Sequence, residues 1–185
     1  SDTGNWDGGA FPTNNPTVII PSGLFSYPEV STVELQNLSI APKAWLRQTS
    51  GTIDIYDQYD LQGTLFRQAG ASFSKADTNS GTVVYEGSGG AIQDYGTGPD
   101  YFNLEIDSWN ETFTHPSGQN LHVAGDLIIR AGSLDLSTNN NALQVDGKLI
   151  VEGSGKLILG SGNVDVAGSV SGMGNIVAGS ATISL

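Results

Sequence analysis

The densest group of side chains that could do chemistry is acidic. Asp54, Asp57 and Asp60 follow one another closely, and Tyr56 and Tyr59 stand between them. Carboxylate oxygens are the ligands that Ca²⁺ prefers, and tyrosine rings beside a groove can stack on sugars. The spacing fits no established calcium loop, and three Asp in an acidic protein also form an ordinary solvated turn. Two interpretations therefore stay open, a calcium site and a solvated turn.

The sequence lacks the common patterns of catalysis. No Gly-x-Ser-x-Gly elbow is present, and His115 and His122 have no evident partners for a catalytic triad. Four Gly-x-Gly runs lack both the third glycine and the Lys-Ser pair that phosphate-binding loops use, so we interpret them as corners between strands. We therefore expect no enzyme. A polysaccharide lyase using Asp57 or Asp60 is the enzymatic alternative that remains.

The composition excludes several classes of protein. Only 7 Lys and Arg stand against 19 Asp and Glu, a net charge of -12, so the chain lacks the positive face that binding to nucleic acid or an anionic membrane needs. It has no cysteine, which excludes disulfides and thiolate metal sites. Its apolar runs are too short to insert across a membrane. The 25 glycines, with many Ser, Thr and Asn, favour short strands joined by turns.

A repeat organises the second half of the chain. The segments Leu121 to Gly125, Leu143 to Gly147 and Val164 to Gly168 have the same pattern and begin 22 and then 21 residues apart. Further short stretches follow each segment, with apolar residues at every second position and Gly, Ser or Asn in the gaps. Such alternation buries one face of a strand. Several short strands per repeat are typical of one coil of a β-solenoid.

The repeat predicts an all-β fold, a single-stranded right-handed β-solenoid (parallel β-helix). We expect about seven coils over residues 33–185. Residues 1–32 are rich in proline, and we expect them to form an N-terminal arm or cap with one edge strand at Thr17 to Ile20. A β-sandwich is the alternative, because short strands at regular spacing suit it too. Against it, the Asn-Gly signal of tight hairpins does not occur.

The two ends of the predicted solenoid suggest contacts with other molecules. The first segment is either a cap on its own coil or an arm that adds to a neighbouring copy. The repeat continues to Leu185 without an evident cap, so we expect either a longer adhesin or a second copy to cover that end. The residues predicted at a subunit interface are Trp6, Phe11, Val18, Ile19, Ile20, Val170, Ile176, Ile183 and Leu185.

Two triplets fit the acceptor pattern for N-linked sugars. They are Asn37-Leu38-Ser39 and Asn110-Glu111-Thr112. Because such triplets arise often by chance, glycosylation of Asn37 and Asn110 is a hypothesis for intact-mass measurement.

The order of several motifs resembles a known group of proteins. The segments Asn5 to Gly9, Val18 to Gly23 and Tyr27-Pro28 resemble the opening of β-solenoid surface proteins secreted by Bacteroidetes-type bacteria. The segments Gly81 to Gly89 and Tyr101 to Ile106 are similar to their internal unit. The resemblance implies an extracellular, filamentous-haemagglutinin-like surface protein. Large members of this group carry a C-terminal sorting domain, and we do not expect residues 1–185 to contain one.

These observations combine into one expected function and one alternative from a different class. We expect an extracellular structural protein, without a signal peptide in its mature form, whose partners are copies of itself stacked head to tail into a surface filament. The alternative is a monomeric carbohydrate-binding or adhesin segment that holds surface glycans on a flank lined by Tyr and Asp. No cofactor is expected other than the calcium ion considered above.

Overall fold

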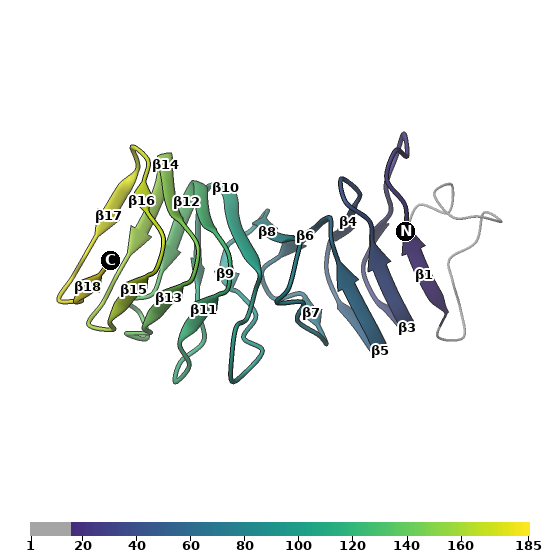
Figure 1. The fold of residues 1–185 in the computed structure, drawn as a ribbon, viewed down its shortest axis with the longest axis horizontal. Helices are drawn as coiled ribbons and strands as arrows, with labels where there is room; N and C mark the ends of the chain where they lie inside the picture. The colour runs from purple at the N-terminus through teal and green to yellow at the C-terminus, as the bar shows by residue number, and fades with distance from the viewer. Residues whose placement is uncertain (1–15) are drawn as a thin grey trace.

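Residues 16–185, the part that the computed structural model describes, form an elongated stack of β-rungs (Figure 1). In this part of the chain every strand pairing is parallel and no helix occurs. The predicted β-solenoid is confirmed, with about 8 turns. The β-sandwich alternative is wrong, because sandwiches are built from antiparallel strands. The described residues contain no helix that is long and apolar enough to cross a membrane.

Three sheets run along the stack. The first contains β1 (Thr17–Ile20), β3 (Val33–Ile40), β5 (Thr52–Leu61) and β7 (Ser72–Phe73). The long second sheet contains β2 (Glu29–Val30), β4 (Trp45–Gln48), β6 (Thr64–Gln68), β8 (Thr82–Glu86), β9 (Gly90–Ala91), β10 (Asn103–Thr114), β12 (Leu127–Asp135), β14 (Leu149–Ile158), β16 (Val170–Ser171) and β17 (Asn175–Val177). The third contains β11 (Leu121–Val123), β13 (Leu143–Val145), β15 (Val164–Val166) and β18 (Ile183–Ser184).

The register confirms the repeat that the sequence shows. Leu121 pairs with Leu143, and Leu143 pairs with Val164, so equivalent residues of successive repeats lie directly above one another. The same holds in the second sheet, where Leu127 pairs with Leu149. One repeat is therefore one turn of the solenoid.

The stack begins earlier in the chain than the sequence indicated. Strand β1 pairs with β3, and β2 pairs with β4, so residues from Thr17 onward already contribute a rung, where the repeats were expected to start near Val33. This additional rung accounts for about 8 turns instead of seven. Strand β1 is the edge strand of the first sheet. Trp6 and Phe11 lie outside the described residues.

Alternating side chains fill the interior. In β3 and β14 apolar residues at alternating positions face inward, and the same positions of neighbouring rungs touch in columns. Successive rungs lie so close that several glycines admit no side chain. A Cβ added at Gly155 would lie 2.1 Å from the carbonyl oxygen of Ile129, whereas one added at Gly153 would meet nothing within 4 Å.

This contrast gives a matched pair of substitutions within β14. We expect Gly155→Ala to lower the free energy of unfolding by about 1–3 kcal/mol, because the rungs must move apart to admit the methyl group. Gly153→Ala should change it by less than about 0.5 kcal/mol. Urea unfolding followed by circular dichroism measures both, and equal effects of the two substitutions would contradict the close contact.

Candidate functional site

A buried arginine occupies the middle of the stack. Arg67 follows the inward alternation of β6, and its side chain is fully buried. Its guanidinium group donates five hydrogen bonds, to Gln48 Oε1 (3.2 Å), Tyr85 Oη (3.2 Å), Tyr95 Oη (3.0 Å), Ala71 O (2.6 Å) and Gln93 Oε1 (2.7 Å). All of these acceptors are neutral. The buried charge is therefore compensated by dipoles, which explains how a cation can occupy a core position.

Aromatic rings complete this polar interior. The guanidinium carbon lies 5.7 Å from the ring centre of Phe73 and 5.4 Å from that of Tyr85. The hydroxyl groups of Tyr85 and Tyr101 are 3.0 Å apart, and the Tyr101 hydroxyl donates to the carbonyl of Gln93. Burial raises the pKa of Tyr101 well above its usual value, so this phenol stays protonated. The group lies where the first sheet ends at β7 and the third begins at β11.

A buried carboxylate lies beside this group. Asp100 is 1% exposed, and its two oxygens accept hydrogen bonds from the backbone N–H groups of Tyr95 (2.9 Å) and His122 (3.1 Å). Burial raises the pKa of Asp100 to about 6, while these two hydrogen bonds act in the opposite direction. Tyr95 connects the buried anion to the buried cation, because its hydroxyl accepts from Arg67 and its N–H donates to Asp100.

A histidine faces this carboxylate. His115 follows directly after β10, is completely buried, and places Nε2 3.9 Å from Oδ2 of Asp100. Neither of its ring nitrogens has a hydrogen-bond partner among the described residues. Burial lowers the pKa of His115. Asp94 and the backbone of Pro116 and Gln119 act in the opposite direction, but none of them lies in hydrogen-bonding geometry to a ring nitrogen. The ring is held neutral and unsatisfied.

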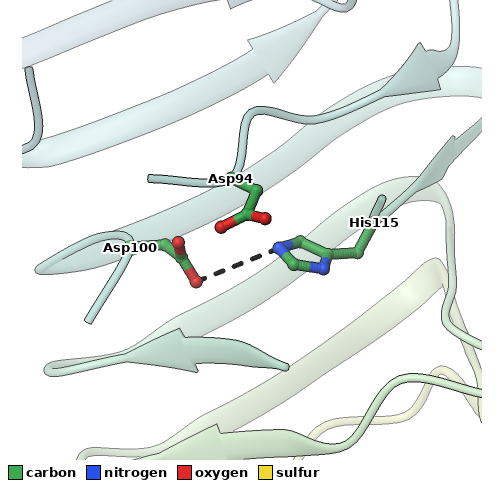
Figure 2. A group of neighbouring side chains, drawn as sticks. All are labelled: Asp94, Asp100 and His115. Carbon is green, nitrogen blue, oxygen red and sulfur yellow. Dashed lines mark ion pairs between the residues drawn. The ribbon is translucent and has the colours of Figure 1, made fainter. Parts of the chain in front are cut away.

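A third side chain points at the same spot. Asp94 follows β9, is half-buried, and accepts a hydrogen bond from the N–H of Gly96 at 2.7 Å. One ligand atom from each of Asp94, Asp100 and His115 lies within 4.8 Å of the others. Figure 2 shows the two carboxylates and the imidazole converging from three directions. We call these three residues the Asp–His cluster. Its oxygen and nitrogen donors could hold a cation or share a proton.

The structure does not bring together the acidic residues that the sequence singled out. Asp54, Asp57 and Asp60 all lie on β5, and extended residues three apart are separated by about 10 Å. Asp60 instead accepts hydrogen bonds from Ser39 and Gln62. Among the described residues, the group spaced to hold an ion is the Asp–His cluster.

The two predicted sugar acceptors lie in different surroundings. The Asn37 amide is engaged between rungs, since it donates to Thr17 Oγ1 and accepts from the N–H of Gln58, each at 2.9 Å. Asn110 is exposed and has a φ of 61°. Attachment of a sugar would break the contacts of Asn37 but not of Asn110, so Asn110 is the better acceptor of the two. Glycosylation itself stays a prediction.

The predicted interface residues also fall into two groups. Val18 and Ile20 face the interior and are buried, so they belong to the core of the first rung, while Ile19 between them is exposed. Val170, Ile176, Ile183 and Leu185 are exposed at the other end of the stack, and Trp6 and Phe11 lie outside the described residues.

An exposed aromatic residue marks the flank of the stack. Trp109 in β10 is 70% exposed and lines a shallow groove. The other residues of the groove are Asn110, Gly132, Ser133, Ser154 and Lys156. An indole face beside hydroxyl and amino groups is suited to stacking on a sugar ring.

The role of Arg67 can be tested against an arginine on the surface. We expect Arg67→Met to lower the free energy of unfolding by about 3 kcal/mol, because Gln48, Gln93 and the tyrosines lose their donor inside the core. The control is Arg130→Met, which removes a half-exposed arginine between Glu105 and Glu152. The control should cost about 1 kcal/mol or less. Equal losses in urea unfolding would show that the buried network adds no more stability than the surface ion pairs of Arg130.

The resemblance to secreted β-solenoid surface proteins stays a prediction. No protein-family model, no curated protein and no solved structure matches this chain.

Proposed function

We propose that the chain is a structural protein of the cell exterior, whose copies stack head to tail into a surface filament. The observation that supports this proposal is the apolar surface of the last rung, formed by β16, β17 and β18, which no other part of residues 16–185 covers. The extracellular location follows from the resemblance of the sequence motifs to secreted surface proteins. The proposal assigns no catalytic role.

Side chains of the last rung occupy core positions. Their partners in the preceding rung are given by the register: Val170 lies opposite Leu149, Ile176 opposite Leu157, and Ile183 opposite Val164. The three partners are at most 2% exposed, whereas the three residues of the last rung are 36–44% exposed. They occupy core positions, but no further rung among the described residues covers them. Covering them contributes about 25 cal/mol per Å² of apolar surface.

The backbone of this rung is also free on one side. Within residues 16–185, β16 and β17 pair only with β14, and β18 pairs only with β15. At the opposite end β1 pairs only with β3. Strands of the first and third sheets take the same place in a turn, since β3 leads into β4 and β11 leads into β12. A second copy can therefore place its β1 on β18 and continue the parallel ladder.

The net charge of -12 suits a linear assembly. Like-charged flanks repel one another and oppose lateral association of filaments. The stacking contact itself is apolar and hydrogen-bonded, so salt should affect bundling of filaments more than their growth.

A charge placed on the last rung tests the proposal. We expect Ile176→Lys and Ile183→Lys to abolish concentration-dependent assembly, because a buried lysine would have no partner in the stacked interface. Trp109→Ala, on the flank, is the matched control and should assemble like the unaltered chain. Analytical ultracentrifugation over a range of concentrations, with negative-stain images of the largest species, measures the result.

Three outcomes would contradict the filament. A chain that stays monomeric at all concentrations would remove the proposal. A discrete dimer would show that the same end pairs with itself, which closes the assembly. Polymers unaffected by either lysine would place the contact elsewhere.

The Trp109 groove favours a second candidate function, the binding of surface glycans by a monomer. Ser133, Ser154 and Lys156 can donate hydrogen bonds to sugar hydroxyls while the indole ring stacks on the sugar face. The acidic flank on β5 around Asp57 and Asp60, which the sequence suggested for this role and for a lyase, stays a prediction.

A panel of neutral and acidic oligosaccharides tests this second function. We expect saturable changes in tryptophan fluorescence with at least one sugar, and a loss of affinity of at least about tenfold in Trp109→Ala. Ile176→Lys should bind the sugar normally, so the two substitutions separate binding from assembly. Binding that survives Trp109→Ala would exclude this groove.

A further inference from the structure

We propose that Asp94, Asp100 and His115 form a binding site for a divalent transition-metal ion, and that zinc fits the site best. The proposal does not depend on filament assembly or on glycan binding, because the Asp–His cluster lies in the middle of the stack. It also differs from the calcium site that the sequence suggested on β5.

The three donors are close to the spacing that an ion needs. Zn²⁺ holds nitrogen and oxygen ligands at about 2.0–2.2 Å, which puts tetrahedral ligands about 3.4 Å apart. In the structure, Nε2 of His115 and Oδ2 of Asp100 are 3.9 Å apart, and the three donor atoms lie within 4.8 Å of one another. A contraction on the order of 1 Å would complete the geometry. The loop between Asp94 and Asp100 contains Gly96 and Gly98, both at positive φ, and has no strand pairing.

The imidazole of His115 is available to an ion. It is completely buried, and neither ring nitrogen has a hydrogen-bond partner among the described residues. A buried polar group without a partner costs about 1–3 kcal/mol. Figure 2 shows that the nitrogen nearer the carboxylates points into the space between them. A metal ion at that point would satisfy a donor that the protein leaves unsatisfied.

Backbone hydrogen bonds hold both carboxylates in place. Asp94 accepts from the N–H of Gly96, and Asp100 accepts from the N–H groups of Tyr95 and His122. Backbone hydrogen bonds of this kind orient the ligands of metal sites. Among the described residues, the basic side chain that faces Asp100 is His115, whose ring is neutral, since Arg67 gives its hydrogen bonds to neutral groups. A divalent ion would neutralise the two clustered carboxylates.

One of the three proposed ligands lies at the surface. Asp94 is half-buried and lines a shallow surface groove together with Gln93 and Pro116. Three protein ligands leave a fourth tetrahedral position for water. A bound ion would connect the loop of residues 94–100 to His115 in the next rung.

The donor set distinguishes between metals. Imidazole nitrogen is a ligand for zinc and other transition metals, whereas Ca²⁺ takes six to eight oxygen ligands. Two carboxylates and one imidazole therefore select against calcium.

Zinc titration of the full chain, first stripped of metal with a chelator, tests the proposal. We expect calorimetry to give one zinc ion per chain and a raised melting temperature, and calcium to have neither effect. Asp94→Asn and His115→Gln should each weaken zinc binding at least about tenfold. The matched control is His122→Gln, because the side chain of this other histidine bonds Asp146 at 2.9 Å. Its hydrogen bond to Asp100 comes from the backbone N–H, which the substitution keeps. This control should keep the full affinity.

A measurement on the unaltered chain covers the case in which His115→Gln does not fold. Long-range ¹H–¹⁵N NMR observes the ring nitrogens of both histidines, and zinc should shift one nitrogen of His115 and leave His122 unchanged. A specific site is expected to bind zinc with a micromolar dissociation constant. The proposal is overturned if no zinc binds at a zinc concentration about 100 times this constant. It is equally overturned if zinc shifts His122 instead of His115, or if binding is lost in His122→Gln and kept in Asp94→Asn.

Discussion

Parallel pairing between successive rungs is the interaction on which the rest of this structure depends. Each rung is too short to bury its own apolar side chains, and the backbone N–H and C=O groups of its strands bond to the rungs on either side. The in-register columns at Leu127 and Leu149 show this dependence at its simplest. Glycines such as Gly155 allow the close approach, since any side chain there would meet the carbonyl of the rung beside it. A rung without a neighbour therefore presents both unpaired backbone and apolar core.

The polar interior at Arg67 differs from the apolar interior of the other rungs. An apolar side chain at this position would avoid the desolvation of a charge, so the arginine is not needed for burial alone. It bonds to Gln48, Tyr85 and Gln93, which belong to different rungs, and so fixes their order where the first sheet gives way to the third. Directional hydrogen bonds can specify one register where apolar contacts alone would tolerate several.

The sequence predicted the repeat well because each turn has nearly the same length and the same alternation. The segments beginning at Leu121, Leu143 and Val164 are stacked as their spacing indicated. It predicted sites poorly for the same reason. Proximity in a solenoid depends on the register between turns, so Asp100 and His115 meet although they are distant in sequence, while Asp57 and Asp60 stay apart on one strand.

All three features with a proposed role lie where the repeat is interrupted. Trp109 lies in the stretch of β10 between Asp107 and Thr112, where the register with β12 shifts. The Asp–His cluster uses the loop of residues 94–100, which takes the place of a regular strand. The last rung lacks a layer above it among the described residues. A regular rung has all its inward groups covered by identical neighbours, so only such interruptions leave donors, rings or apolar faces free to bind something else.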